Sequence, residues 1–425
     1  MNHVTQRYVE QSLDDVRLRR AVADARLSEP CLANWGTRTL DRPLFIPEAE
    51  MRACAADVNA VFDLLATLPD RVFDGDVRRY CAYLGIDPAI ARLLHEYREG
   101  PPTRYGRADL SYDGASFTLL EFNVASDIGG LDIAELHRAL LEVEAFAGFA
   151  EEHRLRYVDP AELVVRSLRA AAPVPDPVVA MVCADDDLAE YRPMLASFAV
   201  ALGRFGLPVV IGGLSDIRAV GRRLHLGSTR VDAVLRYFTV DHVPHTAHLV
   251  EPILRAHENG TATLFTTMDS SLYSNKAALS LLSEPRWWSP PERALIDRVL
   301  PRTRILTPAL VDHCVGDRDR LILKPPRDFG GRGVVAGWET SAQEWKELLN
   351  EHADESYVVQ KRVVPATEPV VDDNGTIAEW LTAWGVFVTP EGYGGAFVRA
   401  LPSGTGAVVN LGAQTAARMA GPFTF

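Results

Sequence analysis

Within residues 105–130, two runs of alternating apolar and polar residues flank an Asp113-Gly114 pair. Alternation with period two is typical of a half-buried β-strand, and Asp-Gly between two such runs is a strong turn signal. The pattern therefore predicts a β-hairpin. A hairpin commits both runs to one sheet, so it constrains the fold more than any other stretch of the chain.

The register of this hairpin decides which polar side chains meet. Successive side chains point to opposite faces of a strand, so Arg107 and Asp109 share one face, as do Glu121 and Asn123. A loop centred on Ala115 places Asp109 opposite Glu121, and Arg107 opposite Asn123. One face then carries two carboxylates, a carboxamide and a guanidinium.

Such a face suits a hard divalent cation, because Mg²⁺ takes oxygen ligands from one or two carboxylates and completes its shell with waters and substrate phosphates. The neighbouring guanidinium suits a migrating phosphoryl group. The alternative is a solvent-facing hairpin whose charges pair across the strands. Strand pairing uses backbone groups, so we expect the fold to tolerate loss of Asp109 or Glu121.

Length and charge narrow the class of protein. A chain of 425 residues predicts two or three subdomains, and 47% hydrophobic with 24% charged residues is typical of a soluble globular protein. The formal net charge of −13 argues against a nucleic-acid or anionic-membrane partner, because either would repel the chain at long range. We expect small-molecule partners.

The cysteine pattern and the apolar runs bear on the compartment. The five cysteines are odd in number and scattered, without a CxxC spacing, which is typical of reduced core thiols in a cytosolic protein. The N-terminus lacks the apolar region of a secretory signal, and no uninterrupted apolar run approaches 18 residues. We therefore expect a cytoplasmic protein.

Lysine is scarce. The sequence contains only Lys276, Lys324, Lys346 and Lys361, so 40 of its 44 basic residues are arginines. A chain with this bias should keep lysine mainly where a compact ammonium cannot be replaced by a planar guanidinium. The alternative, exposed surface lysines, is weakened by this scarcity.

Four regions follow from the pattern along the chain. Residues 1–104 are predicted to be mostly helical and to act as a cap or support. Residues 105–170 contain the hairpin, and a proline cluster then marks a boundary. Residues 171–260 predict a small α/β unit with a parallel sheet, in which 217–223 is helix-like.

The fourth region, 261–425, combines strands with a glycine-rich loop. The strand ending at Lys324 runs into residues 325–334, which contain Gly330, Gly331 and Gly333. Glycines let backbone N–H groups approach an anion, and the ammonium neutralises it, so the loop is a candidate phosphate cover. An ordinary hairpin turn is the alternative. Neither a P-loop nor a Rossmann fingerprint is present.

A family resemblance rests on these motifs together. Lys324-Pro with the glycine loop, Ser274-Asn275-Lys276 and Val358-Val359-Gln360-Lys361 resemble the nucleotide half of an ATP-grasp ligase. In the usual ATP-grasp order the metal-binding carboxylates and asparagine follow that half, but here they precede it. This order resembles the circularly permuted synthetase domain of glutathionylspermidine synthases and their relatives. No amidase domain is present, so their glutathione and polyamine substrates do not transfer.

The resemblance implies a fold and a set of roles. The fold would be α/β (α+β), a circularly permuted ATP-grasp with a small α/β unit and a helical N-terminal region. ATP and Mg²⁺ would be the cofactors. The implied site residues are Asp109, Glu121 and Asn123 for Mg²⁺, Arg107 at the acyl phosphate, Lys276, Lys324, Gly330, Gly331 and Gly333 at the ATP phosphates, Gln360 and Lys361 near the adenine, and Arg399 as a weaker candidate for the phosphate or metal region.

The implied activity is amide-bond formation between a carboxylate and an amine through an acyl phosphate, with release of ADP and phosphate. A peptide or amino-acid ligase of a biosynthetic pathway differs only in substrate. A non-catalytic ATP-binding protein is the alternative from another class, although such a protein has less need of Arg107 beside the metal ligands. The substrates and the oligomeric state do not follow from the sequence.

Overall fold

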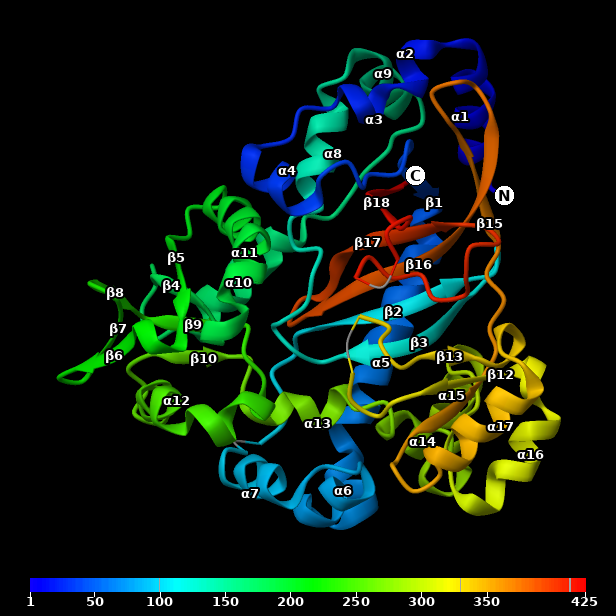
Figure 1. The fold of residues 1–425 in the computed structure, drawn as a ribbon. Coiled ribbons are helices and arrows are strands. Elements are labelled where there is room, and N and C mark those ends of the chain that lie inside the picture. The colour runs from blue at the N-terminus through cyan, green and yellow to red at the C-terminus, as the bar shows by residue number, and fades with distance from the viewer. Residues whose placement is uncertain (99, 329, 413) are drawn as a thin grey trace.

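The computed structural model describes residues 1–425 except 99, 329 and 413. A six-stranded antiparallel sheet lies at the centre, in the order β18-β17-β16-β2-β3, with β15 also paired to β16 (Figure 1). Its strands are β2 (Gly106–Tyr112), β3 (Phe117–Asn123), β15 (Thr367–Val371), β16 (Ile377–Thr389), β17 (Gly392–Pro402) and β18 (Arg418–Ala420). Segments from both halves of the chain therefore build one sheet.

The predicted hairpin is formed by β2 and β3. Arg107 pairs with Asn123 and Asp109 with Glu121, so the predicted register is confirmed at the polar positions. Beyond Asp109 the register shifts and Leu110 pairs with Leu119, which leaves Leu120 as an extra residue in β3. Tyr112 pairs with Phe117 beside the turn, so the expected loop centred on Ala115 is wrong, and the polar pairs match only because the bulge supplies the missing residue. Such a bulge disrupts the ladder locally and frees backbone groups for other partners.

One long helix packs against this sheet. In α5 (Glu48–Phe73) the buried residues include Met51, Val58 and Phe62, at the spacing of one helix face. The remaining helices within the first hundred residues are α1 (His3–Asp14), α2 (Val16–Arg19), α3 (Ala21–Asp24), α4 (Glu29–Trp35), α6 (Val77–Tyr83) and α7 (Pro88–Glu96). This region is mostly helical, as its sequence predicts.

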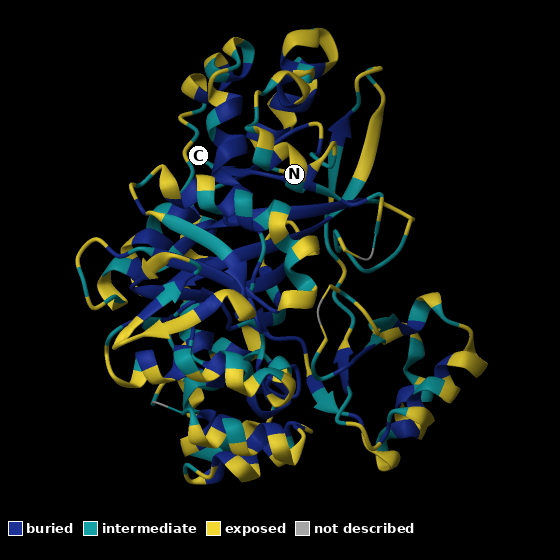
Figure 2. Cartoon of the chain, turned by 60° about the vertical axis from the view of Figure 1, so that its left-hand side comes forward, coloured by how far each residue is buried: buried dark blue, intermediate teal, exposed yellow. Residues whose placement is uncertain are grey.

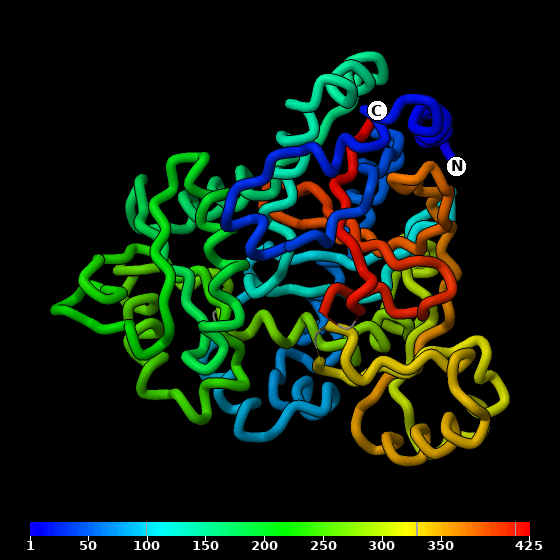
Figure 3. Tube along the Cα trace, turned by 45° about the horizontal axis from the view of Figure 1, so that its top comes forward, coloured from blue at the N-terminus to red at the C-terminus, as the bar shows by residue number. Residues whose placement is uncertain are grey.

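The two ends of the chain lie side by side. The short strand β1 (Leu44–Ile46) pairs in parallel with β19 (Pro422–Thr424), and the N- and C-termini lie close together (Figure 3). The hairpin is followed by α8 (Ala134–Leu141), α9 (Glu144–Glu152) and α10 (Pro160–Ala171). Figure 2 shows that the central strands are largely buried, whereas exposed residues lie on the outer faces of the helices.

The predicted α/β unit is present and its sheet is parallel. Its order is β10-β9-β4-β5, formed by β4 (Val179–Cys183), β5 (Val209–Gly213), β9 (Ala233–Arg236) and β10 (Thr263–Phe265). The helices of the unit are α11 (Leu188–Gly203) and α12 (Val243–Glu258). At the far left of Figure 1 it carries an antiparallel sheet of β6 (Ile217–Val220), β7 (Arg223–Leu226) and β8 (Thr229–Val231).

The helix-like prediction for 217–223 is wrong. These residues form β6, a two-residue turn and the start of β7, with Gly221 at φ +61° in the turn. Glycine adopts this left-handed conformation without a Cβ clash. Ile217 and Leu226 pair across the strands and are both buried, and in β7 burial alternates along the strand, as it does in a β-hairpin with one covered face.

The last lobe is a small antiparallel sheet covered by helices. Its order is β11-β14-β12-β13, formed by β11 (Thr303–Ile305), β12 (Leu321–Lys324), β13 (Val335–Ala336) and β14 (Val358–Lys361). Helices α16 (Val311–Gly316) and α17 (Ala342–Glu351) share a hydrophobic cluster with this sheet. The preceding helices are α13 (Ser271–Ser274), α14 (Ala278–Leu282) and α15 (Pro290–Val299).

All five cysteines are buried and free of disulfide bonds. Outside residues 99, 329 and 413, no helix combines the length and the apolar character needed to cross a membrane.

Candidate active site

A buried ion cluster lies where β2 meets β16 and β17. Asp109 accepts hydrogen bonds from Arg107 Nε at 2.7 Å and Nη2 at 3.0 Å, and Arg399 Nη2 lies 2.9 Å from its Oδ1. Asn123 Nδ2 donates to Asp109 Oδ2 at 3.3 Å. The side chains of Arg107, Asp109 and Arg399 are only 9%, 4% and 7% exposed, and the buried Nε of Arg399 has no hydrogen-bond partner among the described residues.

The electrostatics of the cluster favour the charged forms. Burial would raise the pKa of Asp109, but the guanidinium groups of Arg107 and Arg399 outweigh it and hold that pKa well below its usual range. Burial likewise opposes the charge on Arg107, yet Asp109 raises its pKa. An ionised carboxylate offers about four lone-pair sites, and these four contacts occupy them. Asp109 therefore already has a full set of partners within the protein.

An aromatic ring supports both guanidinium groups. Arg107 lies 4.9 Å and Arg399 5.5 Å from the centroid of Phe397. The ring fits because two neighbours lack side chains: a Cβ on Gly385 would lie 2.7 Å from Phe397 Cε1, and one on Gly130 would lie 2.6 Å from Cδ1. The residue before Gly130 supplies a carbonyl that accepts from Arg107 Nη1 at 2.9 Å. The sequence needs glycine at both positions for steric reasons.

Glu121 and Lys276 form a second pair beside the cluster. Their Oε2 and Nζ atoms are 3.4 Å apart, and Lys276 Nζ also donates to the backbone carbonyl of Asp328 at 2.9 Å. Asp328 belongs to the glycine-rich loop, in which Gly330, Gly331 and Gly333 all have positive φ near +70°. The structure thus brings Lys276 to both the loop and the hairpin.

Lys324 lies at the junction of the last lobe with the hairpin. Its Nζ donates to the carbonyl of Leu120, the extra residue of the bulge, at 3.1 Å and to Gln360 Oε1 at 2.7 Å. Gln360 Nε2 in turn donates to Thr303 Oγ1 at 3.0 Å, so both ends of the Gln360 amide are engaged. Burial lowers the pKa of Lys324 to about 8, which makes its charge sensitive to mildly alkaline pH.

A cavity of about 440 Å³ unites most of the predicted residues. Those that line it are Asp109, Glu121, Lys324, Gly331, Gln360, Lys361 and Arg399. The predicted residues outside its lining are Arg107, Asn123, Lys276, Gly330 and Gly333. Arg107 and Asn123 nevertheless contact Asp109, and Lys276 contacts Glu121, so each is one side chain away from the cavity.

Sequence reasoning missed the apolar end of this cavity. The additional lining residues include Ile322, Val334, Trp338, Val363, Leu381 and the segment 406–410. Ile322 could have been predicted from the sequence, because it lies two residues before Lys324 on the same strand and so shares its face. The segment 406–410 has no such signal, since only long-range folding brings it to the cavity.

The donor chemistry of the site fits a nucleotide phosphate chain better than a cation cage. Among the described residues, no group of three or more His, Cys, Asp and Glu side chains could hold a metal ion. Glu121 and Asn123 offer oxygen atoms of the kind Mg²⁺ prefers, and phosphates or waters complete its shell in such sites. Asp109 could join them only by releasing one of its present donors, of which Asn123 is the most distant.

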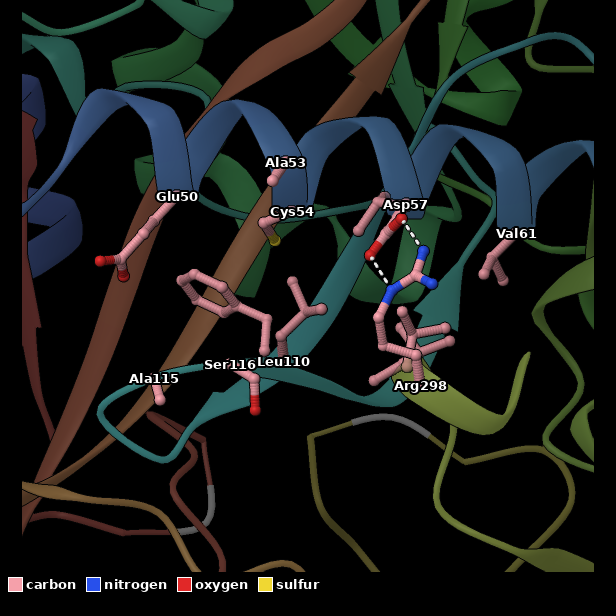
Figure 4. Close-up of a pocket in the computed structure, with 13 residues that line it drawn as sticks. Glu50, Ala53, Cys54, Asp57, Val61, Leu110, Ala115, Ser116 and Arg298 are labelled. Carbon is pink, nitrogen blue, oxygen red and sulfur yellow. Dashed lines mark hydrogen bonds and ion pairs between the residues drawn. The ribbon is translucent and has the colours of Figure 1, made fainter. Parts of the chain in front are cut away.

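The reverse face of the hairpin borders a different cavity. It has a volume of about 220 Å³ and lies between α5 and the hairpin (Figure 4). Leu110 and Cys54 are among its apolar lining residues, and Asp57 accepts from Arg298 at 3.1 and 2.6 Å at its edge. The polar residues of the predicted site lie on the other face of the same strands.

Comparisons with known proteins support the fold. No protein family and no curated protein matches the sequence. The structure resembles a glutathione synthetase-like effector from Globodera pallida, with a TM-score of 0.61 over 99% of this chain and 97% of that chain, at 12% identity. A candidate gamma-glutamylcysteine synthetase from Methylobacillus flagellatus KT gives a TM-score of 0.43 over 84% of this chain and 85% of that chain, at 14% identity. The first likeness shows that this chain has the fold of the effector over nearly its full length.

Proposed function

We propose that the protein is an ATP- and Mg²⁺-dependent carboxylate-amine ligase of the ATP-grasp type, in the circularly permuted arrangement. It would activate a carboxylate as an acyl phosphate and pass it to an amine, releasing ADP and phosphate. The observation that carries the proposal is the 440 Å³ cavity, in which Lys324, Glu121 and Arg399 adjoin an apolar slot. An apolar slot beside convergent charges is what a base with a phosphate chain requires.

The order of the strands supports the permuted arrangement. The hairpin that carries Asp109 and Glu121 precedes the lobe of Lys324 in sequence, yet it pairs through β2 with β16, which follows that lobe. The effector whose fold this chain shares is described as glutathione synthetase-like, which is consistent with a ligase.

Each residue would contribute charge and position. Lys324 and Lys276 would neutralise the phosphates, with the glycine loop above them supplying backbone N–H groups. Arg399, held by Asp109 in the cavity lining, would meet negative charge on the transferred phosphoryl group, and Arg107, behind Asp109, would add positive charge and fix that carboxylate in place. Glu121 and Asn123 would hold Mg²⁺, which would neutralise phosphate charge and align the reacting oxygens.

The resemblance placed Gln360 near the adenine. Because both ends of its amide are engaged by Lys324 and Thr303, we propose that it orients Lys324, and that the base lies against the apolar residues of the slot. The small α/β unit is the proposed wall of the pocket for the carboxylate or amine.

Release of ADP in the presence of pooled carboxylates and amines tests the proposal. The purified chain should form ADP only with Mg²⁺ and with both pools present, and mass spectrometry should detect an amide product. Lys324→Gln is the matched control, because it removes a phosphate contact inside the cavity. ATP binding without substrate-dependent ADP release would instead indicate a non-catalytic ATP-binding protein.

A further inference from the structure

A second set of cations surrounds a depression on the last lobe. The depression has a volume of about 230 Å³, and we name it the basic depression after Arg302, Arg304, Arg320 and Lys361 in its lining. Its floor is apolar, formed by Leu310, Cys314, Leu321 and Val359. It lies between α16 and the edge of the sheet formed by β11 and β14.

Strand register places Arg304 on the side of the sheet away from the Lys324 contacts. Arg304 and Val359 are partners in register and both line the depression, whereas Gln360, one residue further on, lines the 440 Å³ cavity. Lys361 lies at the end of its strand and borders both spaces. Its backbone N–H donates to the carbonyl of Arg302 at 2.9 Å, which brings the two basic residues together.

These four side chains lack acidic partners. In the described part of the chain, no hydrogen bond or ion pair joins any of them to a carboxylate, although the sequence has 57 acidic residues and 44 basic ones. Arginines near by are paired, for example Arg293 with Asp297 at 3.1 Å. The acidic residue of the lining, Asp317, instead faces His313 at 3.6 Å.

Four adjacent, uncompensated cations repel one another. Like charges on neighbouring strands are destabilising, and a bound anion would relieve the repulsion further than hydration and salt do. Arg304 and Cys314 line the same space, and the charge of Arg304 acts against the increase that burial causes in the pKa of the Cys314 thiol, to about 11.

We propose that the basic depression binds a small organic phosphate, with the phosphate against the guanidinium groups and the apolar or planar body on the floor. Guanidinium groups match the geometry of phosphate oxygens through paired hydrogen bonds. A concave space of about 230 Å³ suits a small molecule rather than an extended polymer, and the net charge of −13 repels large polyanions. The depression shares Lys361 with the lining of the 440 Å³ cavity, but Arg302, Arg304 and Arg320 do not line that cavity, and the proposal does not depend on the proposed function.

Calorimetric titration of the full chain with inorganic pyrophosphate tests the site. We expect Arg304→Gln/Arg320→Gln to weaken one class of pyrophosphate sites at least about tenfold, because two charge-assisted contacts are lost. The matched control is Arg166→Gln/Arg255→Gln, which removes two charges from exposed helical pairs elsewhere and should leave binding unchanged. Equal binding by the wild type and the Arg304→Gln/Arg320→Gln variant overturns the proposal, as does absence of binding by the wild type.

The role of the floor has its own test. Phenyl phosphate should bind to the wild type at least several-fold more tightly than inorganic phosphate, because its ring buries apolar surface on the floor. The difference should disappear in Arg304→Gln/Arg320→Gln. If phenyl phosphate and phosphate bind equally to the wild type, the site is not one for an organic phosphate.

Discussion

Replacement of Asp109 by asparagine tests whether the protein needs this carboxylate for its stability. In the wild type the cluster of Arg107, Asp109 and Arg399 has a net charge of +1, and it rises to +2 in Asp109→Asn. The asparagine also presents an NH₂ group where a carboxylate oxygen now accepts from Arg107 or Arg399. Both guanidinium groups are too buried for water to replace the lost partner.

The size of the effect follows from that burial. Removing one partner of a buried ion pair costs about 3–5 kcal/mol, because the remaining charge is left uncompensated. The entropy of unfolding is about 2.1 cal/mol/K per residue, or roughly 0.9 kcal/mol/K if the 425 residues unfold as one unit. The expected decrease in Tm for Asp109→Asn is therefore about 3–6 °C.

Scanning calorimetry at pH 7 measures this difference, with Glu121→Gln as the matched control. The Glu121 side chain is 29% exposed, and its partner Lys276, 3.4 Å away and only 7% exposed, keeps its hydrogen bond to the carbonyl of Asp328, so Glu121→Gln should cost less than Asp109→Asn. A double variant, Asp109→Asn/Arg399→Gln, should recover part of the stability, because it removes one of the two unpaired charges. If Asp109→Asn keeps the wild-type Tm, Asp109 is not the anchor of the cluster.

The pH dependence of the same difference has a definite sign. The pKa of Asp109 is lower in the folded protein than its usual value of 3.8, so the unfolded chain takes up the proton first as pH falls. The stability that Asp109 contributes is thus present above about pH 4 and is lost below it. We expect the Tm difference between wild type and Asp109→Asn to shrink only in that acidic range.

Three further predictions concern the neighbouring residues. Because burial lowers the pKa of Lys324 to about 8, kcat/KM for ATP should fall as pH rises through about 8, whereas an ordinary lysine would hold its charge to about 10.5. Thr303→Val removes the acceptor for Gln360 Nε2 and should weaken ATP binding in calorimetry several-fold, with recovery in Thr303→Ser; equal affinities would exclude this role. Gly385→Ala inserts a Cβ 2.7 Å from Phe397 Cε1 and should lower the free energy of unfolding by about 1–3 kcal/mol, measured by denaturant titration; an unchanged midpoint would show that the ring can move aside.

The parts of the site that the sequence predicted are those set by local periodicity. Alternation was sufficient to predict which side chains share a face, but the pairing of Asp109 with Glu121 also depends on the bulge, because the strands leave the turn one residue out of the register that a loop centred on Ala115 would give. The bulge at Leu120 was not predictable, because nothing in its apolar neighbourhood marks which residue leaves the ladder. That bulge determines which carbonyl meets Lys324.

Contacts between segments that are distant in the sequence explain why the role of Arg399 was hard to predict. Arg399 was only a weak candidate, since its neighbours Gly394 and Gly395 indicate a turn rather than a partner. The pairing of β2 with β16, and of β16 with β17, brings it to Asp109 across 290 residues of chain. The face on which a side chain lies could be predicted from its place along one strand. The side chain that it meets on another strand could not, because that contact depends on how the whole sheet is assembled.

The expectation that the fold tolerates loss of Asp109 illustrates the same limit. Backbone pairing in β2 does not require a carboxylate, so the hairpin alone would survive the substitution. Arg107 and Arg399, however, can be buried at the junction of three strands only while Asp109 balances their charge. If these guanidinium groups serve phosphoryl transfer, the requirement that they be preorganised and dry makes the same carboxylate necessary for stability. Function and stability are therefore coupled at Asp109, whereas the more exposed Glu121 leaves them separable.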